Sequence, residues 1–241
     1  MDTVKYYELF SKKKHWFIIY SLPLIILNLS CSNMNYKNKS PGSQNILEEI
    51  EIGSQKWMAE NLNVDSFRNG VKIKEVNSIE EWNIAFADKK PAWCYYEFNS
   101  KNGIKYGKIY NWFAIVDSNG LAPNRWRIPF DKDWRILFEY LGGEDSADIK
   151  LKSTIGWNLI DGKGNGNNSS GFNATPGGLL HGNFEEIGNG AFYWGIIEKD
   201  SPVREITDKV TTSLSNRTEY VECTLTTDDG GFYVRCLKKN N

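Results

Sequence analysis

The sequence predicts an α+β fold, and two observations support that prediction. Two segments in the first part of the chain, 79–88 and 131–141, place apolar residues at helical spacing. The second half consists of short apolar runs separated by glycine-rich turns, a pattern typical of short antiparallel strands. Because no boundary is visible after residue 46, helices and strands are expected to share one domain.

The globular part begins with a predicted β-hairpin. Residues 32–45 are rich in Asn, Ser, Lys, Gly and Pro, with little to bury, and they indicate a flexible tether. Two strand-like runs follow, at 46–52 and 55–59. The Gly-Ser pair at 53–54 between them suits a tight turn, so we expect the two runs to pair with each other.

The first helix is predicted from its start signal and its apolar face. Ser78 stands three residues before Glu81, which is the spacing of a capping box. Three large apolar residues fall on one side of such a helix, namely Ile79, Trp82 and Phe86. The helix is therefore expected to run from residue 79 to about residue 88.

The second helix has the clearest local pattern. Asp131 follows a Pro-Phe pair and is expected to cap the helix. Four apolar residues then fall at i, i+3, i+4 and i+7, namely Trp134, Leu137, Phe138 and Leu141. Gly142 and Gly143 end the pattern in the usual way for a helix C-terminus. We expect this apolar stripe to pack in the core.

The last predicted hairpin leads to a disulfide prediction. If Asp229 and Gly230 are the two turn residues, Cys223 and Cys236 face each other as a non-hydrogen-bonded pair. The Cα atoms of such a pair are about 4.5 Å apart, which lies within the range that a disulfide accepts. The alternatives are two buried free thiols, or a bridge from Cys94 to Cys236.

The N-terminus predicts export and a lipid anchor. Lys12–Lys14 precede a mostly apolar run at 16–29, which is shorter than the roughly 20 apolar residues of a spanning helix. The placement of Cys31 resembles a bacterial lipoprotein signal, although Asn28 stands where an aliphatic residue is usual. Residues 1–31 would then be the signal, and Cys31 would be acylated. The chain would lie in the cell envelope, at the outer membrane; the alternative is an uncleaved anchor or a buried segment.

Composition excludes several classes of protein. The first 31 residues carry four of the 29 basic and two of the 30 acidic side chains, which leaves 25 against 28 and a net charge near −3. That balance gives no electrostatic case for nucleic acid as a partner. His15 and His181 are the two histidines, and no Cys-x-x-Cys spacing occurs, so triad, zinc and redox chemistry are all weakly supported.

Several segments in this order and spacing resemble a known family. They are Ile52–Leu62, Tyr106–Trp112, Trp126–Pro129 with Asp133-Trp134, Leu141–Gly143, Gly171–Ala174 with Pro176–Gly178, and Gly231–Cys236. The family is the Fibrobacter succinogenes major paralogous domain, which occurs in exported and lipid-anchored proteins, many of them from Bacteroidetes. The resemblance covers residues 46–238. Each segment alone is a weak signal, whereas the set is specific.

The resemblance implies a fold related to C-type lectins and to formylglycine-generating enzymes, with two helices, twisted antiparallel sheets and long loops. It implies no settled activity. Two departures matter: Ala122 replaces a family cysteine, so Cys94 lacks its expected partner, and Tyr193–Glu198 replaces a run of hydroxyl-bearing residues. Two arginines are expected to be structural, Arg127 by holding a buried carboxylate or a chain end, and Arg235 by facing outward or pairing with an acid.

Aromatic side chains are the candidate ligand-binding groups. Flat rings can stack on sugars or peptides, with neighbouring Asn and Asp side chains binding the polar groups. The candidates are Trp93, Tyr95, Tyr96, Trp157, Tyr193 and Trp194. We expect at least one of them to line a groove. The alternative for each ring is a place in the core, where aromatic residues of strands commonly pack.

No cofactor, metal or catalytic residue is predicted. Asp161, Asn165 and Asn167 carry oxygen atoms suited to calcium, but Lys163 lies among them and no glutamate closes the loop. Formylglycine-generating chemistry needs a reactive cysteine pair, which the predicted disulfide would occupy. The predicted function is therefore non-catalytic binding of a glycan or a surface protein at the cell envelope. An enzyme on the same fold and an envelope scaffold without a small ligand are the alternatives.

Overall fold

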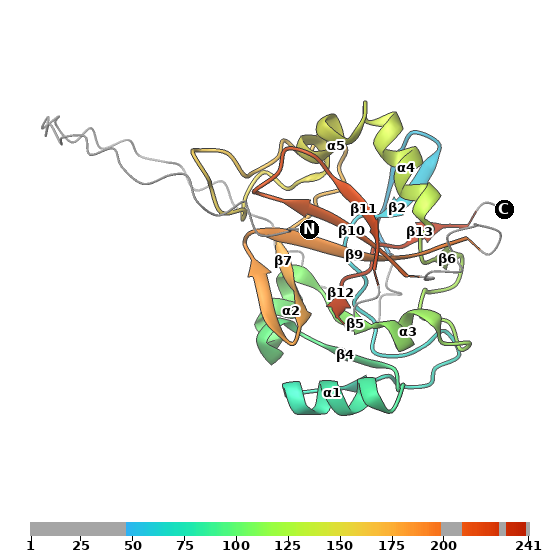
Figure 1. Ribbon diagram of the computed structural model, residues 1–241. Helices are drawn as coiled ribbons and strands as arrows, with labels where there is room; N and C mark the ends of the chain where they lie inside the picture. Colours follow the sequence, from blue (N-terminus) through green and yellow to red (C-terminus); the bar gives the residue numbers. More distant parts are fainter. Residues whose placement is uncertain (1–46, 199–208, 227–229, 240–241) are drawn as a thin grey trace, which may run out of the picture. The chain divides into compact units, whose positions relative to one another are not determined.

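The structure, a computed structural model, describes residues 47–198, 209–226 and 230–239. The predicted signal at 1–31, with Cys31, and the predicted tether at 32–45 lie outside the described residues. The described chain is an α+β fold, as the sequence predicts, with short helices and two sheets (Figure 1). None of the helices in these ranges combines the length and the apolar character that crossing a bilayer requires.

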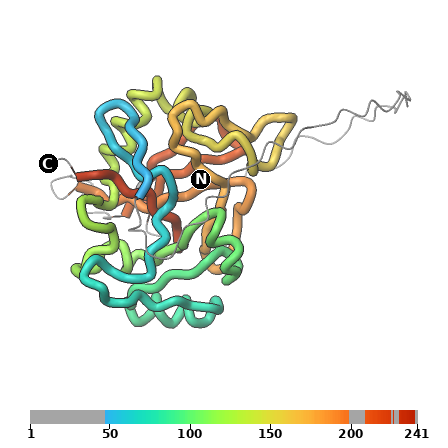
Figure 2. The backbone as a smooth tube through the Cα atoms, turned by 180° about the vertical axis from the view of Figure 1, so that it is seen from behind, coloured from blue at the N-terminus to red at the C-terminus, as the bar shows by residue number. Residues whose placement is uncertain are grey.

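The smaller sheet pairs the first strands of the described chain with its last strand. In sheet order its strands are β1 (Glu49–Ile52), β2 (Gln55–Met58), β13 (Leu237–Lys238) and β6 (Trp126–Arg127). β1 and β2 form the predicted hairpin, and Gly53 in its turn has a φ of +62°, which glycine adopts without strain. Figure 2 shows this blue hairpin beside the red C-terminal segment, in agreement with the pairing of β13 and β2.

The larger sheet is mixed. In sheet order its strands are β11 (Glu222–Leu225), β10 (Lys209–Ser215), β9 (Gly190–Ile196), β7 (Gly177–His181), β12 (Gly231–Phe232), β5 (Ile109–Asn111), β4 (Ala92–Cys94) and β3 (Lys74–Glu75), with β8 (Asn183–Ile187) paired to β7. The pairs β3–β4 and β7–β9 are parallel, and the other strand pairs are antiparallel. β12 therefore inserts a segment from near the C-terminus into the middle of the sheet.

Two of the helices were predicted. The helices are α1 (Ile79–Ala87), α2 (Ser100–Tyr106), α3 (Trp112–Val116), α4 (Asp131–Tyr140) and α5 (Glu144–Leu151), with a 3₁₀ turn η1 (Tyr96–Phe98). α1 and α4 confirm the two sequence predictions, and the Oγ of Ser78 caps α1 by accepting the N–H of Glu81 at 3.1 Å. α4 and α5 lie together, whereas α1 lies beyond β4, away from them (Figure 1).

The cap of α4 differs from the prediction. Asp131 is the first residue of the helix, and Asp133 supplies the cap by accepting the backbone N–H of Phe130 at 2.6 Å. The same carboxylate is buried and accepts two hydrogen bonds from Arg127, at 2.5 and 2.8 Å. Arg127 therefore holds a buried carboxylate, as expected, and this carboxylate also starts the helix.

At β9, both faces of the larger sheet are covered by side chains. Tyr193 on β9 packs against Trp134 of α4, with ring centres 5.7 Å apart. The next residue, Trp194, points the opposite way and packs against Phe232 at 4.5 Å. Successive residues of a strand point to opposite faces, and here both directions lead into an apolar cluster. Neighbouring aromatic residues on one strand can therefore both be buried.

Within 209–226 and 230–239, the described part of this region, the predicted last hairpin and its disulfide do not form. β11 pairs with β10, where Cys223 faces Thr212, and β12 pairs with β5 and β7. Cys94, Cys223 and Cys236 are all free thiols, so the predicted bridge and its alternative through Cys94 are both wrong. The prediction assumed that consecutive strands pair with each other. Here the two strands pair with partners elsewhere in the sheet. Asp229 of the supposed turn lies outside the described residues.

Candidate functional site

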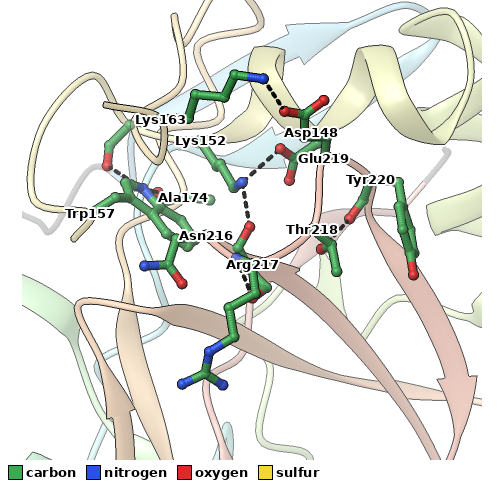
Figure 3. Close-up of polar contacts among 12 residues, drawn as sticks. Asp148, Lys152, Trp157, Lys163, Ala174, Asn216, Arg217, Thr218, Glu219 and Tyr220 are labelled. Atoms are coloured by element: carbon green, nitrogen blue, oxygen red, sulfur yellow. Dashed lines mark hydrogen bonds and ion pairs between the residues drawn. The ribbon is translucent and has the colours of Figure 1, made fainter. Parts of the chain in front are cut away.

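A cleft of about 880 Å³ opens beside α5. Its walls come from three segments. They are 145–152, which covers α5 and the residue after it, the turn at 160–165, and the connection 216–220 between β10 and β11. Figure 3 shows polar contacts among residues of these segments, including Asp148, Lys152 and Asn216, and their neighbours. A volume of this size falls within the range of small-ligand sites, about 300–1,000 Å³. We call it the α5 cleft.

A buried ion pair forms the floor of the α5 cleft. The Nζ of Lys152 lies 2.6 Å from the Oδ2 of Asp148 and 2.6 Å from the backbone oxygen of Ser215. The side chains of Lys152 and Asp148 are only 4% and 8% exposed. The ring of Trp157 lies 5.0 Å from the same Nζ. Burial raises the pKa of Asp148, and the hydrogen bond from Lys152 opposes that rise only in part.

Two acceptor oxygens in the cleft wall have no partner among the described residues. They are Asp148 Oδ1 and Asn216 Oδ1, and both are buried. The Nδ2 of Asn216 donates to the backbone oxygen of Asn158 at 2.9 Å and to Asn189 Oδ1 at 3.0 Å, which establishes which end of the amide is the oxygen. Buried polar atoms are nearly always hydrogen-bonded. These two oxygens therefore have unused hydrogen-bonding capacity, which an ordered water or a ligand donor that reaches the floor of the cleft would satisfy.

The rim of the cleft combines ion pairs with exposed apolar groups. Lys163 pairs with Glu219 at 2.6 Å, and Arg217 pairs with Glu186 at 2.8 Å. Three large apolar side chains around the cleft are exposed by 41–48%: Ile149, Ile160 and Tyr220. Polar acceptors below and apolar surface above form the usual composition of a site that orients a small polar ligand.

The wall at 160–165 is a tight turn. The first and last residues of 160–163 exchange backbone hydrogen bonds of 2.7 and 2.9 Å. Between them Asp161 and Gly162 have φ values of +51° and +80°, which suits an Asp-Gly hairpin turn. Asn165, a possible calcium ligand, accepts the backbone N–H of Trp157 at 3.1 Å instead. In the described part of the chain, no three His, Cys, Asp or Glu side chains are placed to hold a metal ion.

The six aromatic residues singled out in the sequence do not form one surface. Five of them are buried, with 0–4% exposure: Trp93, Tyr96, Trp157, Tyr193 and Trp194. Tyr95 is half-buried. Because Trp93, Tyr193 and Trp194 are buried, the rings on the strands of the larger sheet have no free face for stacking. None of the six rings lines the α5 cleft, so the expectation that at least one of them lines a groove is not met there; Trp157 contacts Lys152 from beneath the floor.

Two of these rings already hold a cation from the same chain. The Nζ of Lys108 lies 4.2 Å from the ring centre of Trp93 and 5.1 Å from that of Tyr95. It also donates to the Oδ1 of Asn63 at 2.9 Å. A buried ammonium over aromatic faces is stabilised by the ring quadrupoles. Trp93 and Tyr95 therefore stabilise the fold by enclosing an internal lysine.

Arg235 joins three of the segments that suggested the family. Its guanidinium donates to Asn61 Oδ1 at 3.0 and 2.7 Å, to the Phe172 backbone oxygen at 2.5 Å and to the Ala59 backbone oxygen at 3.0 Å. The side chain is 1% exposed, so the expectation that it faces outward is wrong. Its partners are carbonyl and amide oxygens, and burial lowers the pKa of Arg235. Arg235 therefore has a structural role in the core. The α5 cleft is the better candidate for a functional site.

Asp161, Lys163 and Asn165 were considered from the sequence only as a calcium loop, and the polar residues of the cleft floor were not singled out. Asp148 and Lys152 show an i, i+4 spacing that commonly marks an ion pair on a helix surface. That signal gives no sign of burial, because burial here depends on Ser215 and Trp157 from other parts of the chain. Asn216 and Tyr220 have no distinctive local pattern. Their roles appear only after the connection 216–220 meets α5.

Comparison with known protein families supports the resemblance that the sequence segments indicated. The model of the Fibrobacter succinogenes major domain matches residues 50–238, which is most of the chain. The chain therefore belongs to this family. No curated protein and no solved structure is significantly similar to it.

Proposed function

We propose that this protein is a non-catalytic binding module of the cell envelope, and that the α5 cleft binds a glycan. The observation that carries the proposal is the pair of buried acceptors, Asp148 Oδ1 and Asn216 Oδ1, which have no partner among the described residues. Sugar hydroxyls are donors that suit such acceptors. The ring of Tyr220 is 41% exposed beside them and can pack against the apolar face of a sugar.

The proposal includes a membrane anchor and a lectin-like fold. An acylated Cys31 would hold the domain at the outer membrane, outside the cytoplasm. Membership of a family whose domains occur in exported, lipid-anchored proteins supports this location. The α+β fold with short helices and long loops is compatible with a C-type-lectin-like arrangement, in which loops rather than strands carry the ligand. The α5 cleft is likewise built largely from connections.

An enzyme of the formylglycine-generating type is less well supported. That chemistry needs a reactive cysteine pair, whereas Cys223 faces Thr212 of β10 and the backbone oxygen of Cys236 accepts the N–H of Met58 of β2. Burial also raises the pKa of Cys94, Cys223 and Cys236, so little of any thiol is ionised near neutral pH. A scaffold role without a small ligand is the remaining alternative, and the absence of any ligand in the binding test would favour it.

The binding test uses a glycan array with the full chain in mild detergent. We expect binding that survives a chelator, is lost in Tyr220→Ala, and is kept in Tyr140→Ala, which removes an exposed tyrosine from α4 outside the cleft. Binding to a peptide library and to no glycan would replace the glycan with a protein partner. Turnover of a bound compound would contradict the non-catalytic role.

A further inference from the structure

The charges around the α5 cleft do not balance. Four acids and three bases line it. Each base already has an acidic partner: Lys152 with Asp148, Lys163 with Glu219, and Arg217 with Glu186. Asp145 and Asp161 are exposed and make no ion pair among the described residues. With Glu186 included, five acids face three bases, which is an excess of two negative charges.

The floor and the rim favour different donors. At the floor, the Lys152–Asp148 pair is neutral as a whole, and the ammonium of Lys152 would repel a second cation placed beside it. The free acceptors there, Asp148 Oδ1 and Asn216 Oδ1, therefore suit neutral hydroxyl groups. At the rim, Asp145 and Asp161 attract a positive group in a partly solvated setting.

The negative charges of Asp145 and Asp161 are only weakly compensated by nearby cations. The pKa of Lys163 is raised chiefly by its hydrogen bond with Glu219, and Asp161 contributes least. Lys163 is thus held mainly by Glu219, with both side chains more than 70% exposed. An anionic sugar, carrying carboxylate or sulfate, would meet the excess negative charge of the rim and be disfavoured.

We infer that the glycan bound in the α5 cleft is an amino sugar chain whose amino groups are free and protonated. Hydroxyl groups of one sugar unit donate to Asp148 and Asn216 at the floor, and an ammonium group faces Asp145 and Asp161 at the rim. The exposed side chains of Ile149 and Ile160 contact the apolar faces of the rings. This inference rests on the proposed glycan-binding function and specifies its ligand class.

The test compares three oligosaccharides of equal length: a glucosamine chain, an N-acetylglucosamine chain and a glucose chain. Their affinities for the full chain in mild detergent are measured by calorimetry, at a pH that keeps the free amine protonated. We expect the glucosamine chain to bind about tenfold more tightly than either neutral chain, because two carboxylates act on its ammonium groups. Added salt should reduce that advantage, since the rim is exposed.

A charge variant separates this effect from general sugar binding. Asp145→Asn with Asp161→Asn should lower the affinity for the glucosamine chain to that of the neutral chains, which should be unaffected. Both positions are exposed, so folding should be preserved. The control Glu80→Gln removes an equally exposed carboxylate from α1, outside the cleft, and should change nothing.

The outcomes distinguish the two proposals. If the protein binds neutral glycans on the array yet gains nothing from free amino groups, the inference fails and the proposed function stands. If the charge variant weakens all three sugars equally, the rim carboxylates do not select an ammonium group and the inference fails. If no glycan of any kind binds, the proposed function fails and the inference fails with it.

Discussion

The guanidinium of Arg235 joins chain segments up to 177 residues apart in sequence. A buried apolar residue at this position would leave the backbone oxygens of Met58, Ala59 and Phe172 without these donors. Because an unsatisfied buried acceptor costs about 1–3 kcal/mol, the arginine stabilises the core through its geometry rather than through an ion pair. Sequence alternation could not show this, because it describes one strand and the partners come from two distant segments.

We predict that Arg235→Lys lowers the free energy of unfolding by about 2–4 kcal/mol, because an ammonium cannot reproduce the planar set of donors. The measurement is urea unfolding followed by tryptophan fluorescence. The control is Arg217→Lys, whose side chain is 59% exposed and should change stability by less than about 0.5 kcal/mol. Equal losses in both variants would show that Arg235 is not a structural centre.

The three thiols should differ in reactivity. Cys94 and Cys236 are buried and Cys223 is half-buried, and burial raises the pKa of all three. Iodoacetamide at neutral pH should therefore label Cys223 first and the other two only after unfolding. Mass mapping of the labelled peptides is the measurement. Recovery of a crosslinked peptide pair without reductant would contradict the free thiols.

At the scale of elements, the sequence was informative where structure is local. The β1–β2 hairpin, α1 and α4 were predicted because a turn pair, a capping serine and a four-residue apolar stripe each act within a few residues. α2, α3 and α5 were missed because they are seven, five and eight residues long, too short for a clear helical period. β12 was assigned the wrong neighbours because pairing between distant strands leaves no local signal.

A matched pair of glycines on the β7–β8 hairpin tests close packing. Gly178 and Gly182 have nearly equal φ values of +71° and +69°, so alanine is strained to a similar degree at both. A Cβ at Gly178 would lie 2.3 Å from the backbone oxygen of Glu185, whereas a Cβ at Gly182 meets nothing within 4 Å. We predict that Gly178→Ala destabilises the fold by about 2 kcal/mol more than Gly182→Ala.

Thermal unfolding of the two glycine variants in parallel provides the measurement. Since the backbone strain is shared, the difference between them reports the close contacts at Gly178, which are with β8 and with the ring of Tyr96. Similar melting temperatures for the two variants would mean that β8 does not pack against β7 as closely as the structure has it.

At the scale of the whole molecule, the fold was easier to predict than the site. Six short segments indicated the family, and Arg235 shows why distant segments belong together. The α5 cleft, in contrast, forms where 145–152, 160–165 and 216–220 meet, and none of these segments carries a recognisable motif. The aromatic candidates failed because the alternation of a strand does not reveal whether its second face is covered.

The proposed anchor is tested by Cys31→Ser in cells labelled with radioactive palmitate. The variant should lose the label and move from the membrane fraction to the soluble fraction, because serine has no thiol to acylate. The tyrosine variant Tyr220→Ala serves as the control and should keep both the label and its location. Unchanged labelling in Cys31→Ser would exclude lipidation at this residue.

The most direct measurement of the central claim is hydrogen–deuterium exchange of the full chain with and without a glycan that it binds on the array. The binding site proposed here predicts slower exchange at 145–152 and 216–220, with little change at the strands that carry Trp93 and Trp194. Protection centred on those strands, or elsewhere outside the α5 cleft, would contradict the account.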